Sequence, residues 1–436
     1  MNNPTKFGPA TLAPGYSKSN AAGLLVASFT AIPLVSFINF AQPFLLEEVF
    51  HVPKEEQGVL TGQLAAMQEF IVLMLMGFVG AMSDNWGRKI IMIIGLAMLA
   101  LGLVIYPLAT QANDLYAYRI VFAIGAAMVP VMYSTTLQDT AANKSRGIFT
   151  ALGSFCTGLG MVLIATQIGK LPQQLIDSGL DPMMAGRYTY WCMVILALVV
   201  AIAVHWLWRS GGETRMEKKV PALQLVSQGF AEAKLNPRIA LSYMTAFASR
   251  GDLVVVGTFM SLWVVQSSSD YNLTSAEGLA RAGIMVAIVQ GTAMLWAIVM
   301  GILCDKINRV LAVFIGFSIA AVAYVNMSLI DNPFASSALI ACIVLGVGEI
   351  STIIAGSALI GQEAPAERRG SILGVFSLIG AAGILLGTYF GGVVFDGVGR
   401  TAPFLMMGIV NAMVAITALV VLLRSPGMTG AEVQSQ

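Results

Sequence analysis

Charged side chains are scarce in this sequence. Only 11% of its 436 residues are Asp, Glu, Lys or Arg, whereas 57% are hydrophobic, and a typical soluble domain has about 25% charged residues. The mean hydropathy is +0.79. This composition excludes a soluble or disordered chain and indicates a membrane protein. The net charge of +1 gives no general attraction to nucleic acid, so we expect no nucleic-acid partner.

Cysteine and histidine are also rare. The four cysteines lie far apart along the chain, and no group of them or of the two histidines has the spacing of a metal site. The sequence lacks a Gly-x-x-x-x-Gly-Lys-Ser/Thr nucleotide loop, an HExxH pair and a Ser/His/Asp set at one depth. We therefore expect a protein that is not an enzyme and that holds no metal and no cofactor.

Long hydrophobic runs dominate what is present. A bilayer core about 30 Å thick is crossed by about 20 helical residues. Runs of that length occur twelve times, without the alternation of a membrane barrel. They predict an all-α membrane protein whose twelve transmembrane helices form two pseudo-symmetric six-helix bundles. The expected spans are 22–47, 59–82, 90–110, 115–138, 147–169, 187–209, 238–265, 276–303, 310–330, 334–360, 370–394 and 403–424.

The positions of the basic residues predict the topology. Seventeen of the 24 Lys and Arg residues fall in segments on one side if both termini share that side. Because positive charge favours the cytoplasmic side, both termini are expected there, in the cell inner membrane. The domain prediction is a cytoplasmic segment 1–21, a bundle 22–209, a cytoplasmic linker 210–237, a bundle 238–424 and a cytoplasmic tail 425–436. Within the linker, 222–235 could form a short amphipathic helix on the membrane surface.

Three landmarks recur in the same order in both halves of the chain. Asp84 and Asp305 are 221 residues apart, each four residues after a glycine. The Arg-Gly pairs at Lys144-Ser-Arg146-Gly147 and Arg368-Arg369-Gly370 are 223 apart, and the Gly-Arg pairs ending at Arg187 and Arg400 are 213 apart. These matches indicate a duplicated six-helix unit, with a substrate path expected between the copies.

The loop Gly80-Ala-Met-Ser-Asp84-Asn-Trp-Gly87-Arg88-Lys89 resembles motif A of the major facilitator superfamily. The weaker copy ending at Asp305 and Arg309, the six-plus-six layout and the central loop match as well, over about 22–424. The resemblance implies a secondary transporter in which these residues form a cytoplasmic conformational latch. The predicted latch residues are Gly80, Asp84, Gly87, Arg88, Lys89, Asp305 and Arg309. Gly80 would allow close helix approach and Gly87 a tight turn, whereas simple positive-inside anchoring is the structural alternative.

Two further segments bear on the subfamily. Arg119, followed by Gly125 and Ala127, is similar to motif B of the family, although Phe122 stands where glutamine is frequent. Arg119 could instead be a structural arginine near the interface. The fifth span, which includes Gly153 and Gly160, lacks the Gly-Pro pair of many drug/proton antiporters. This absence disfavours a standard multidrug antiporter without excluding export.

Ionisable residues within the spans are the candidate transport residues, because charge at membrane depth is costly. By the family's rule that spans one, four, seven and ten line the cavity, several polar residues would face the path. The predicted substrate-binding or proton-coupling residues are Glu69, Arg119, Arg250, Asp252, Glu349, Asn39 and Gln42, with the three acids as candidate proton carriers. The alternative is a structural pair of Arg250 with Asp252 or Glu349, although residues two apart on a helix face different sides.

The sequence therefore predicts a secondary active transporter that works by alternating access and is driven by the proton gradient. Arg119 and Arg250 favour a small organic solute that is anionic or amphiphilic. The expected partners are this solute and the lipid bilayer, and the expected state is a monomer. The alternatives are a multidrug or toxic-compound exporter and a membrane sensor that no longer transports.

Overall fold

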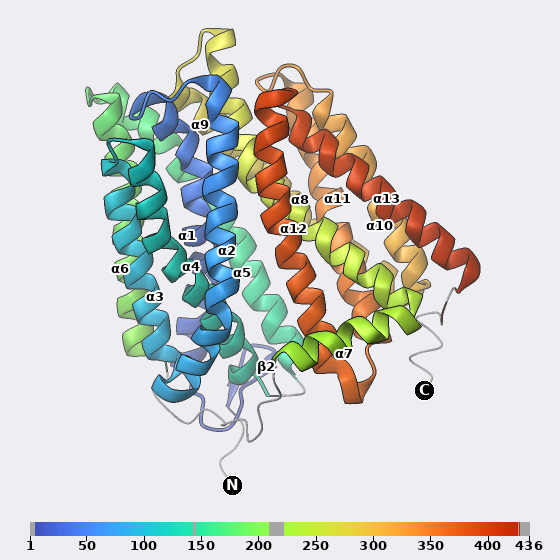
Figure 1. Cartoon of the computed structure of the whole chain (residues 1–436). Coiled ribbons are helices and arrows are strands. Elements are labelled where there is room, and N and C mark those ends of the chain that lie inside the picture. The colour runs from blue at the N-terminus through green and yellow to red at the C-terminus, as the bar shows by residue number, and fades with distance from the viewer. Residues whose placement is uncertain (1–4, 143–144, 209–221, 426, 428–436) are drawn as a thin grey trace. The chain divides into compact units, whose positions relative to one another are not determined.

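The structure is a computed structural model, which describes residues 5–142, 145–208, 222–425 and 427. Within them, twelve helices are long and apolar enough to cross a membrane, which confirms the predicted fold class (Figure 1). Each corresponds to one predicted span. They are α1 (Lys18–Glu48), α2 (Lys54–Trp86), α3 (Arg88–Ile105), α4 (Ala112–Thr140), α5 (Arg146–Asp177), α6 (Pro182–Leu207), α8 (Pro237–Ser268), α9 (Ser275–Lys306), α10 (Arg309–Ser328), α11 (Ser336–Glu363), α12 (Arg369–Gly397) and α13 (Ala402–Arg424).

The described residues divide into two compact units. Unit 1 takes its residues from 1–54, 67–215 and 268–287, and unit 2 takes its residues from 55–66, 216–267 and 288–436. Helices α2 and α9 contribute residues to both units. The predicted division at 22–209 and 238–424 stays a prediction, and residues 210–221 of its linker lie outside the described residues.

Unit 1 is packed through glycines at helix crossings. A side chain at Gly125 of α4 would meet the Leu99 backbone of α3, and one at Gly102 of α3 would meet Phe122 of α4. Gly160 brings α5 against the backbone of Phe29 in α1. Small residues allow such close approach, so dispersion contacts between backbones can hold apolar helices together without a hydrophobic driving force.

Unit 2 uses the glycines of α12 in the same way. Side chains at Gly383, Gly387 and Gly391 would meet residues of α8, namely Phe247, Gly251 and Phe259. These glycines therefore allow α12 to pack closely against α8. Gly374 differs, because a side chain there would meet no described residue within 4 Å.

The predicted linker helix over 222–235 is confirmed as α7 (Ala222–Leu235). It packs within unit 2 across one end of α12, as Figure 1 shows. Val226 and Ala233 contact a buried cluster that includes Ile372 and Val375 of α12. The Tyr243 hydroxyl of α8 donates to the Gly229 carbonyl at 3.0 Å. The apolar face of α7 therefore packs on protein, and its polar face supplies Glu232, which pairs with Arg368.

A small hairpin precedes α1 in this otherwise helical protein. Strands β1 (Lys6–Phe7) and β2 (Ala10–Thr11) pair in antiparallel register. The chain then pairs with the residues that follow α4, because Ala142 N donates to Thr11 O and Ala13 N donates to Thr140 O, at 3.0 and 2.9 Å. Strands this short have no readable periodicity, so the sequence could not predict them. The predicted tail at 425–436 lies outside the described residues except for 425 and 427.

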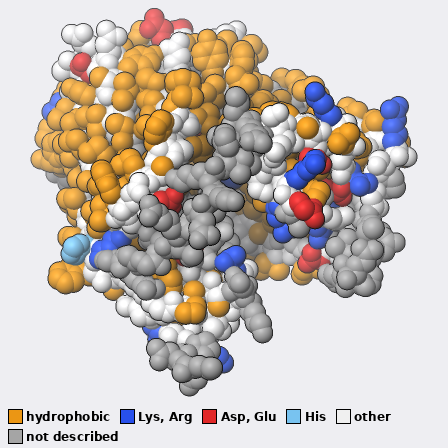
Figure 2. Space-filling view, turned by 60° about the horizontal axis from the view of Figure 1, so that its bottom comes forward, with side chains coloured by type: hydrophobic (Ala, Val, Ile, Leu, Met, Phe, Trp, Pro, Cys, Tyr) orange, Lys and Arg blue, Asp and Glu red, His pale blue; other side chains and the backbone are white. Residues whose placement is uncertain are grey.

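Large hydrophobic side chains cover the flanks of the spanning helices. Phe78, Ile195, Leu295 and Ile416 are each more than 60% exposed. Figure 2 shows a broad area of orange hydrophobic side chains that contains few Lys, Arg, Asp or Glu side chains. Apolar flanks of this extent match hydrocarbon rather than water, as expected of a multi-pass membrane protein.

Candidate functional site

The motif A loop forms the turn between α2 and α3. Gly87 has a φ of +87°, a left-handed backbone that favours glycine, and it directly precedes α3. The predicted tight turn is therefore confirmed. Arg88 at the start of α3 forms an ion pair with Asp139 near the end of α4. Asp84 is exposed at the end of α2.

The close helix approach predicted at Gly80 stays a prediction. A side chain at Gly80 would meet no described residue within 4 Å. Close contact in unit 1 occurs instead at crossings such as Gly160 with Phe29. Motif spacing identified the turn correctly, but it could not show which helix surface was covered.

The second copy of the motif makes its turn without a glycine. Asn308 stands in the place of Gly87, has a φ of −58°, and caps α10. Its side-chain oxygen accepts from Val310 N at 2.8 Å and Leu311 N at 3.2 Å. Arg309 donates to the Ala358 carbonyl at 3.1 Å, and Asp305 is exposed at the end of α9. The two loops therefore use different turn chemistry at equivalent places.

Unit 1 contains an arginine cluster, made of Asn39 and Gln42 from α1, Tyr106, and Arg119 from α4. Tyr106 begins the short 3₁₀ turn η1 (Tyr106–Leu108). The guanidinium of Arg119 donates to Gln42 Oε1 at 3.0 Å and to Asn39 Oδ1. The Tyr106 hydroxyl donates to the same Gln42 oxygen at 2.7 Å. The structure thus brings together three residues that the sequence had predicted separately.

Aromatic rings complete the surroundings of Arg119. Its guanidinium carbon lies 5.7 Å from the Tyr106 ring centre and 5.9 Å from that of Phe122. Both are distances at which the negative face of an aromatic ring attracts a cation. Arg119 is fully buried, and its Nε has no hydrogen-bond partner among the described residues. Glu69 of α2, half-buried, lies within electrostatic range of this guanidinium.

Unit 2 contains an acidic cluster, made of Asp252 from α8, Tyr324 from α10, Glu349 from α11 and Asn411 from α13. Asn411 Nδ2 donates to Asp252 Oδ1 at 2.8 Å. Tyr324 lies within electrostatic range of both carboxylates. Gln290 of α9 donates to Glu349 Oε1 at 3.4 Å. Four helices therefore place two acids in one apolar interior.

Each member of the acidic cluster has an oxygen without a hydrogen-bond partner among the described residues. These atoms are Asp252 Oδ2, Glu349 Oε2, Asn411 Oδ1 and the Tyr324 hydroxyl, on side chains that are at most 2% exposed. Buried polar atoms are normally paired, since an unpaired one costs about 1–3 kcal/mol. Such a concentration of acceptors is suited to a proton or a small cation.

Arg250 does not share the environment of Asp252. Arg250 is exposed and Asp252 is buried, so they lie on different faces of α8, as their spacing predicted. Asn411 donates to Asp252, and Tyr324 lies within electrostatic range of it. The carbon stem of Arg250 packs near Gly380 of α12.

Sequence reasoning missed Asp396, near the end of α12. Its two oxygens accept from Gly58 N at 2.9 Å and Val59 N at 2.6 Å, in the unit 2 part of α2. A signal was available, because Gly392-Val-Val-Phe-Asp396-Gly-Val-Gly399-Arg400 repeats the Gly-x-x-x-Asp-x-x-Gly-Arg spacing of Gly80–Arg88. Asp139 was also missed, and no local pattern marks it as the partner of Arg88.

A family model for the Major Facilitator Superfamily matches residues 24–388. The chain belongs to the major facilitator superfamily. This match confirms the family predicted from the motif A loop. Membership of this family points to a transporter rather than an enzyme. Superfamily transporters bind small molecules and lie in the bilayer.

Two curated relatives and one solved structure are similar to this protein over most of its length. Magnetosome protein MamH of Paramagnetospirillum magneticum is 25% identical over 92% of this chain and 92% of its own length. The class D tetracycline resistance protein of Salmonella ordonez is 25% identical over 79% of this chain and 82% of its own. The D323A mutant of the nucleoside transporter NupG matches with a TM-score of 0.72 at 15% identity, over 92% of this chain and 99% of that structure. At this identity the NupG match supports the fold alone.

Proposed function

We propose that this protein is a secondary active transporter that moves a small organic solute by alternating access and takes its energy from the proton gradient. The observation that carries the proposal is the acidic cluster of unit 2. Asp252 and Glu349 are buried there with unpartnered oxygens, and neither forms an ion pair with a described residue. Protonation would remove the cost of burying each charge, so proton occupancy can be coupled to a change in the surroundings of these acids.

The proposed solute carries negative charge or has an anionic head group. Arg119 supports this choice, because its guanidinium is bound by neutral oxygens of Asn39 and Gln42 and keeps its full positive charge. Arg250, exposed on α8, is a second candidate contact for an anionic group. Glu69 is the candidate that would adjust the charge near Arg119.

The proposed location is the cell inner membrane, with both termini cytoplasmic and the chain acting as a monomer. The motif A residues Asp84, Arg88 and Lys89 and their counterparts Asp305 and Arg309 would then form the cytoplasmic latch, with the Arg88–Asp139 ion pair as one contact. Similarity to MamH adds the magnetosome as a second candidate location.

Export of a drug-like compound is the second candidate function. The similarity to the tetracycline resistance protein over 79% of this chain favours it. The absence of a Gly-Pro pair in α5 disfavours it. Tetracycline therefore belongs in the solute panel beside carboxylates, phosphorylated solutes and anionic amphiphiles.

The test starts with purified protein and a thermal-unfolding screen of that panel. Solutes that stabilise the protein are then followed in proteoliposomes with an imposed pH gradient and a pH-sensitive dye inside. Asp252→Asn and Glu349→Gln should each reduce gradient-driven accumulation at least tenfold while counterflow without a gradient persists. Asp331→Asn, at an exposed position outside the helices, is the matched control. Unchanged accumulation in both cluster variants would refute the assignment of proton coupling to this cluster.

A further inference from the structure

Asn411 of α13 is in direct contact with Asp252 of α8 inside unit 2. Both side chains are fully buried, and Asn411 Nδ2 donates to Asp252 Oδ1 at 2.8 Å. The absence of a side chain at Gly251 allows this contact, because a side chain there would meet Met407, about one turn before Asn411 on α13. The two helices are therefore close together at the depth of this hydrogen bond.

The hydrogen bond leaves one oxygen on each of the two side chains without a partner in the part of the chain that the structure describes. These oxygens are Asp252 Oδ2 and Asn411 Oδ1. An amide oxygen and an ionised carboxylate oxygen can only accept, so they cannot satisfy each other. Each buried acceptor without a donor costs about 1–3 kcal/mol. The pair therefore lacks a hydrogen that its two free oxygens could share.

The charge of Asp252 is also uncompensated. Asp252 forms no ion pair with a described residue, and the ionisable groups within electrostatic range of it are Glu349 of α11 and Tyr324 of α10, neither of which is a cation. Arg250 lies on another face of α8, where it is exposed. Burying an ionised carboxylate without a cation costs far more than leaving a hydrogen bond unmade.

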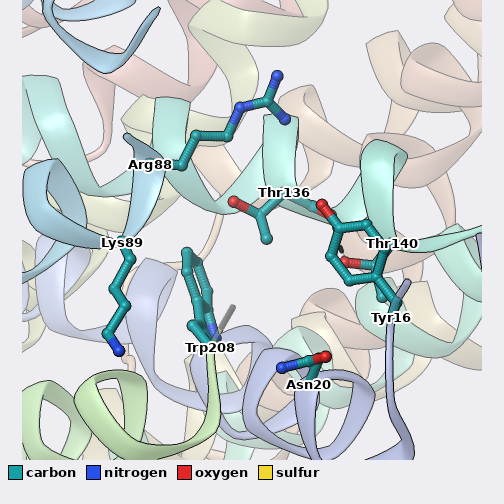
Figure 3. Close-up of a pocket in the computed structure, with 7 residues that line it drawn as sticks. All are labelled: Tyr16, Asn20, Arg88, Lys89, Thr136, Thr140 and Trp208. Carbon is teal, nitrogen blue, oxygen red and sulfur yellow. Dashed lines mark hydrogen bonds between the residues drawn. The ribbon is translucent and has the colours of Figure 1, made fainter. Parts of the chain in front are cut away.

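Water can satisfy unpartnered groups elsewhere in the protein. Trp208 and Thr136 each have a buried polar atom that lacks a partner within the described ranges, and both line a pocket with room for about one water molecule (Figure 3). A water between Asp252 and Asn411 could donate to both oxygens, but it would leave the carboxylate charge in place. A proton removes the charge and supplies the missing hydrogen, so it meets both requirements.

We propose that Asp252 holds a proton on Oδ2 and donates it to Asn411 Oδ1, so that the two side chains form an acid–amide pair with two parallel hydrogen bonds. The nitrogen and oxygen of an amide are spaced much as the two oxygens of a carboxyl group are, so the bond already present allows the second one to form beside it. Asn411 is then the positioning residue for this proton. The amide contact of Glu349 is longer, since Gln290 Nε2 lies 3.4 Å from Glu349 Oε1, beyond the usual range of about 2.7–3.2 Å.

Loss of this proton would weaken the contact between α8 and α13. The pair would keep one hydrogen bond, and it would gain a buried charge and an unpaired acceptor on each side chain. The use of this change in transport rests on the proposed function, whereas the acid–amide pair itself does not. A direct measurement of the proton therefore tests the pair without a transport assay.

Infrared spectroscopy detects such a proton, because a protonated carboxyl group has a C=O stretching band that an ionised carboxylate lacks. The full-length protein is purified in an uncharged detergent at neutral pH, with and without heavy carbon at the side-chain carboxyls of aspartate. The label separates aspartate bands from glutamate bands. We expect a protonated aspartate band in the wild type that is lost in Asp252→Asn and kept in Glu349→Gln.

Asn411→Leu tests the role of the amide. It removes the N–H that donates to the Asp252 carbonyl oxygen, and the band should move to higher frequency because a hydrogen bond lowers the C=O stretching frequency. Asn326→Leu, at an exposed position on α10, is the matched control and should leave the band in place. A purely structural role of Asn411 would lower the unfolding temperature of the variant without moving the band.

The proposal is overturned if the wild type has no protonated aspartate band, if Asp252→Asn keeps it, or if Asn411→Leu leaves it unmoved. Replacing potassium with sodium salts should not change the band, and its loss in sodium would show that these oxygens hold a cation instead. The wild type and Asp252→Asn decide the test if Asn411→Leu fails to fold. Failure of the proposed function would appear separately, as normal gradient-driven accumulation by Asp252→Asn although the wild type has the band.

Discussion

The arginine cluster of unit 1 and the acidic cluster of unit 2 solve the problem of buried charge in opposite ways. Arg119 carries a permanent charge, and the neutral side-chain oxygens of Asn39 and Gln42 accept hydrogen bonds from its guanidinium. Asp252 and Glu349 carry charges that a proton can remove, and their cluster leaves oxygens unpartnered. The first arrangement is suited to holding a fixed charge, and the second is suited to changing one.

The comparison gives the two units different proposed roles. Fixed charge in unit 1 is suited to attracting an anionic group, since it persists at every physiological pH. Removable charge in unit 2 is suited to coupling, since its occupancy can differ between conformations. The variants below test this difference from the largest expected effect to the smallest.

Removing the fixed charge should have the largest effect on stability. Arg119→Met leaves Asn39 Oδ1 without the guanidinium donor and should lower the free energy of unfolding by about 1–3 kcal/mol, the cost of a buried acceptor that loses its hydrogen bond. Denaturant unfolding in detergent micelles measures this loss. Arg424→Met, at the exposed end of α13, is the control. A loss below about 1 kcal/mol would contradict the view that hydrogen bonds from the Arg119 guanidinium stabilise this cluster.

Removing the carboxylate of Asp396 should have the second largest effect on the free energy of unfolding. Asp396→Ala removes an acceptor of the Gly58 and Val59 amides, and we expect a loss of about 1–2 kcal/mol because the site is half-buried. The thermal unfolding of this variant should be compared with that of Asp331→Ala. Equal unfolding of the two variants would show that this contact adds nothing to unit 2, and that Asp252 is not exceptional among its acids.

Neutralising Asp252, which carries a removable charge, should change the free energy of unfolding only a little. Asp252→Asn keeps an oxygen that accepts from Asn411 and removes a buried charge, so its free energy of unfolding should stay within about 1 kcal/mol of the wild type or rise. Asp252→Ala should be worse, because the Asn411 amide loses its acceptor. If Asp252→Asn destabilised the protein as much as Arg119→Met, the contrast between the two clusters would fail.

The two cluster tyrosines provide the finest comparison. Tyr106→Phe removes a hydrogen bond to Gln42 and should cost about 1 kcal/mol. Tyr324→Phe removes a hydroxyl without a hydrogen-bond partner among the described residues and should change the free energy of unfolding by less than about 0.5 kcal/mol. Matched denaturant titrations of both variants measure the difference, and a larger loss for Tyr324→Phe would reverse the assignment.

Features set by local chemistry could be predicted from the sequence. Hydrophobic length located the twelve spans, the amphipathic pattern located α7, and glycine spacing identified the turn at Gly87. Each depends on residues close in sequence or on the preference of one residue type. The predicted contact at Gly80 stays a prediction, because coverage of a helix surface depends on the neighbouring helices.

Partners that are far apart in sequence could not be predicted. Arg119 was identified as a candidate, but its bond to Gln42 spans 77 residues and joins two helices. The bond between Asp252 and Asn411 spans 159 residues, and Asn411 has no feature that distinguishes it from a packing residue. Side-chain pairs of this kind follow from helix rotation and crossing angle, which a hydropathy pattern leaves open.

The β1–β2 hairpin also has a consequence for biosynthesis. Thr11 and Ala13 leave the ribosome well before Thr140 and Ala142, with which they pair, and before Ser145, whose Oγ accepts from Thr11 N at 3.0 Å. At about 5–20 residues per second, their partners emerge many seconds later. The amino-terminal end therefore stays undocked while α1 to α4 enter the bilayer, and its docking would mark the time at which this part of unit 1 is complete.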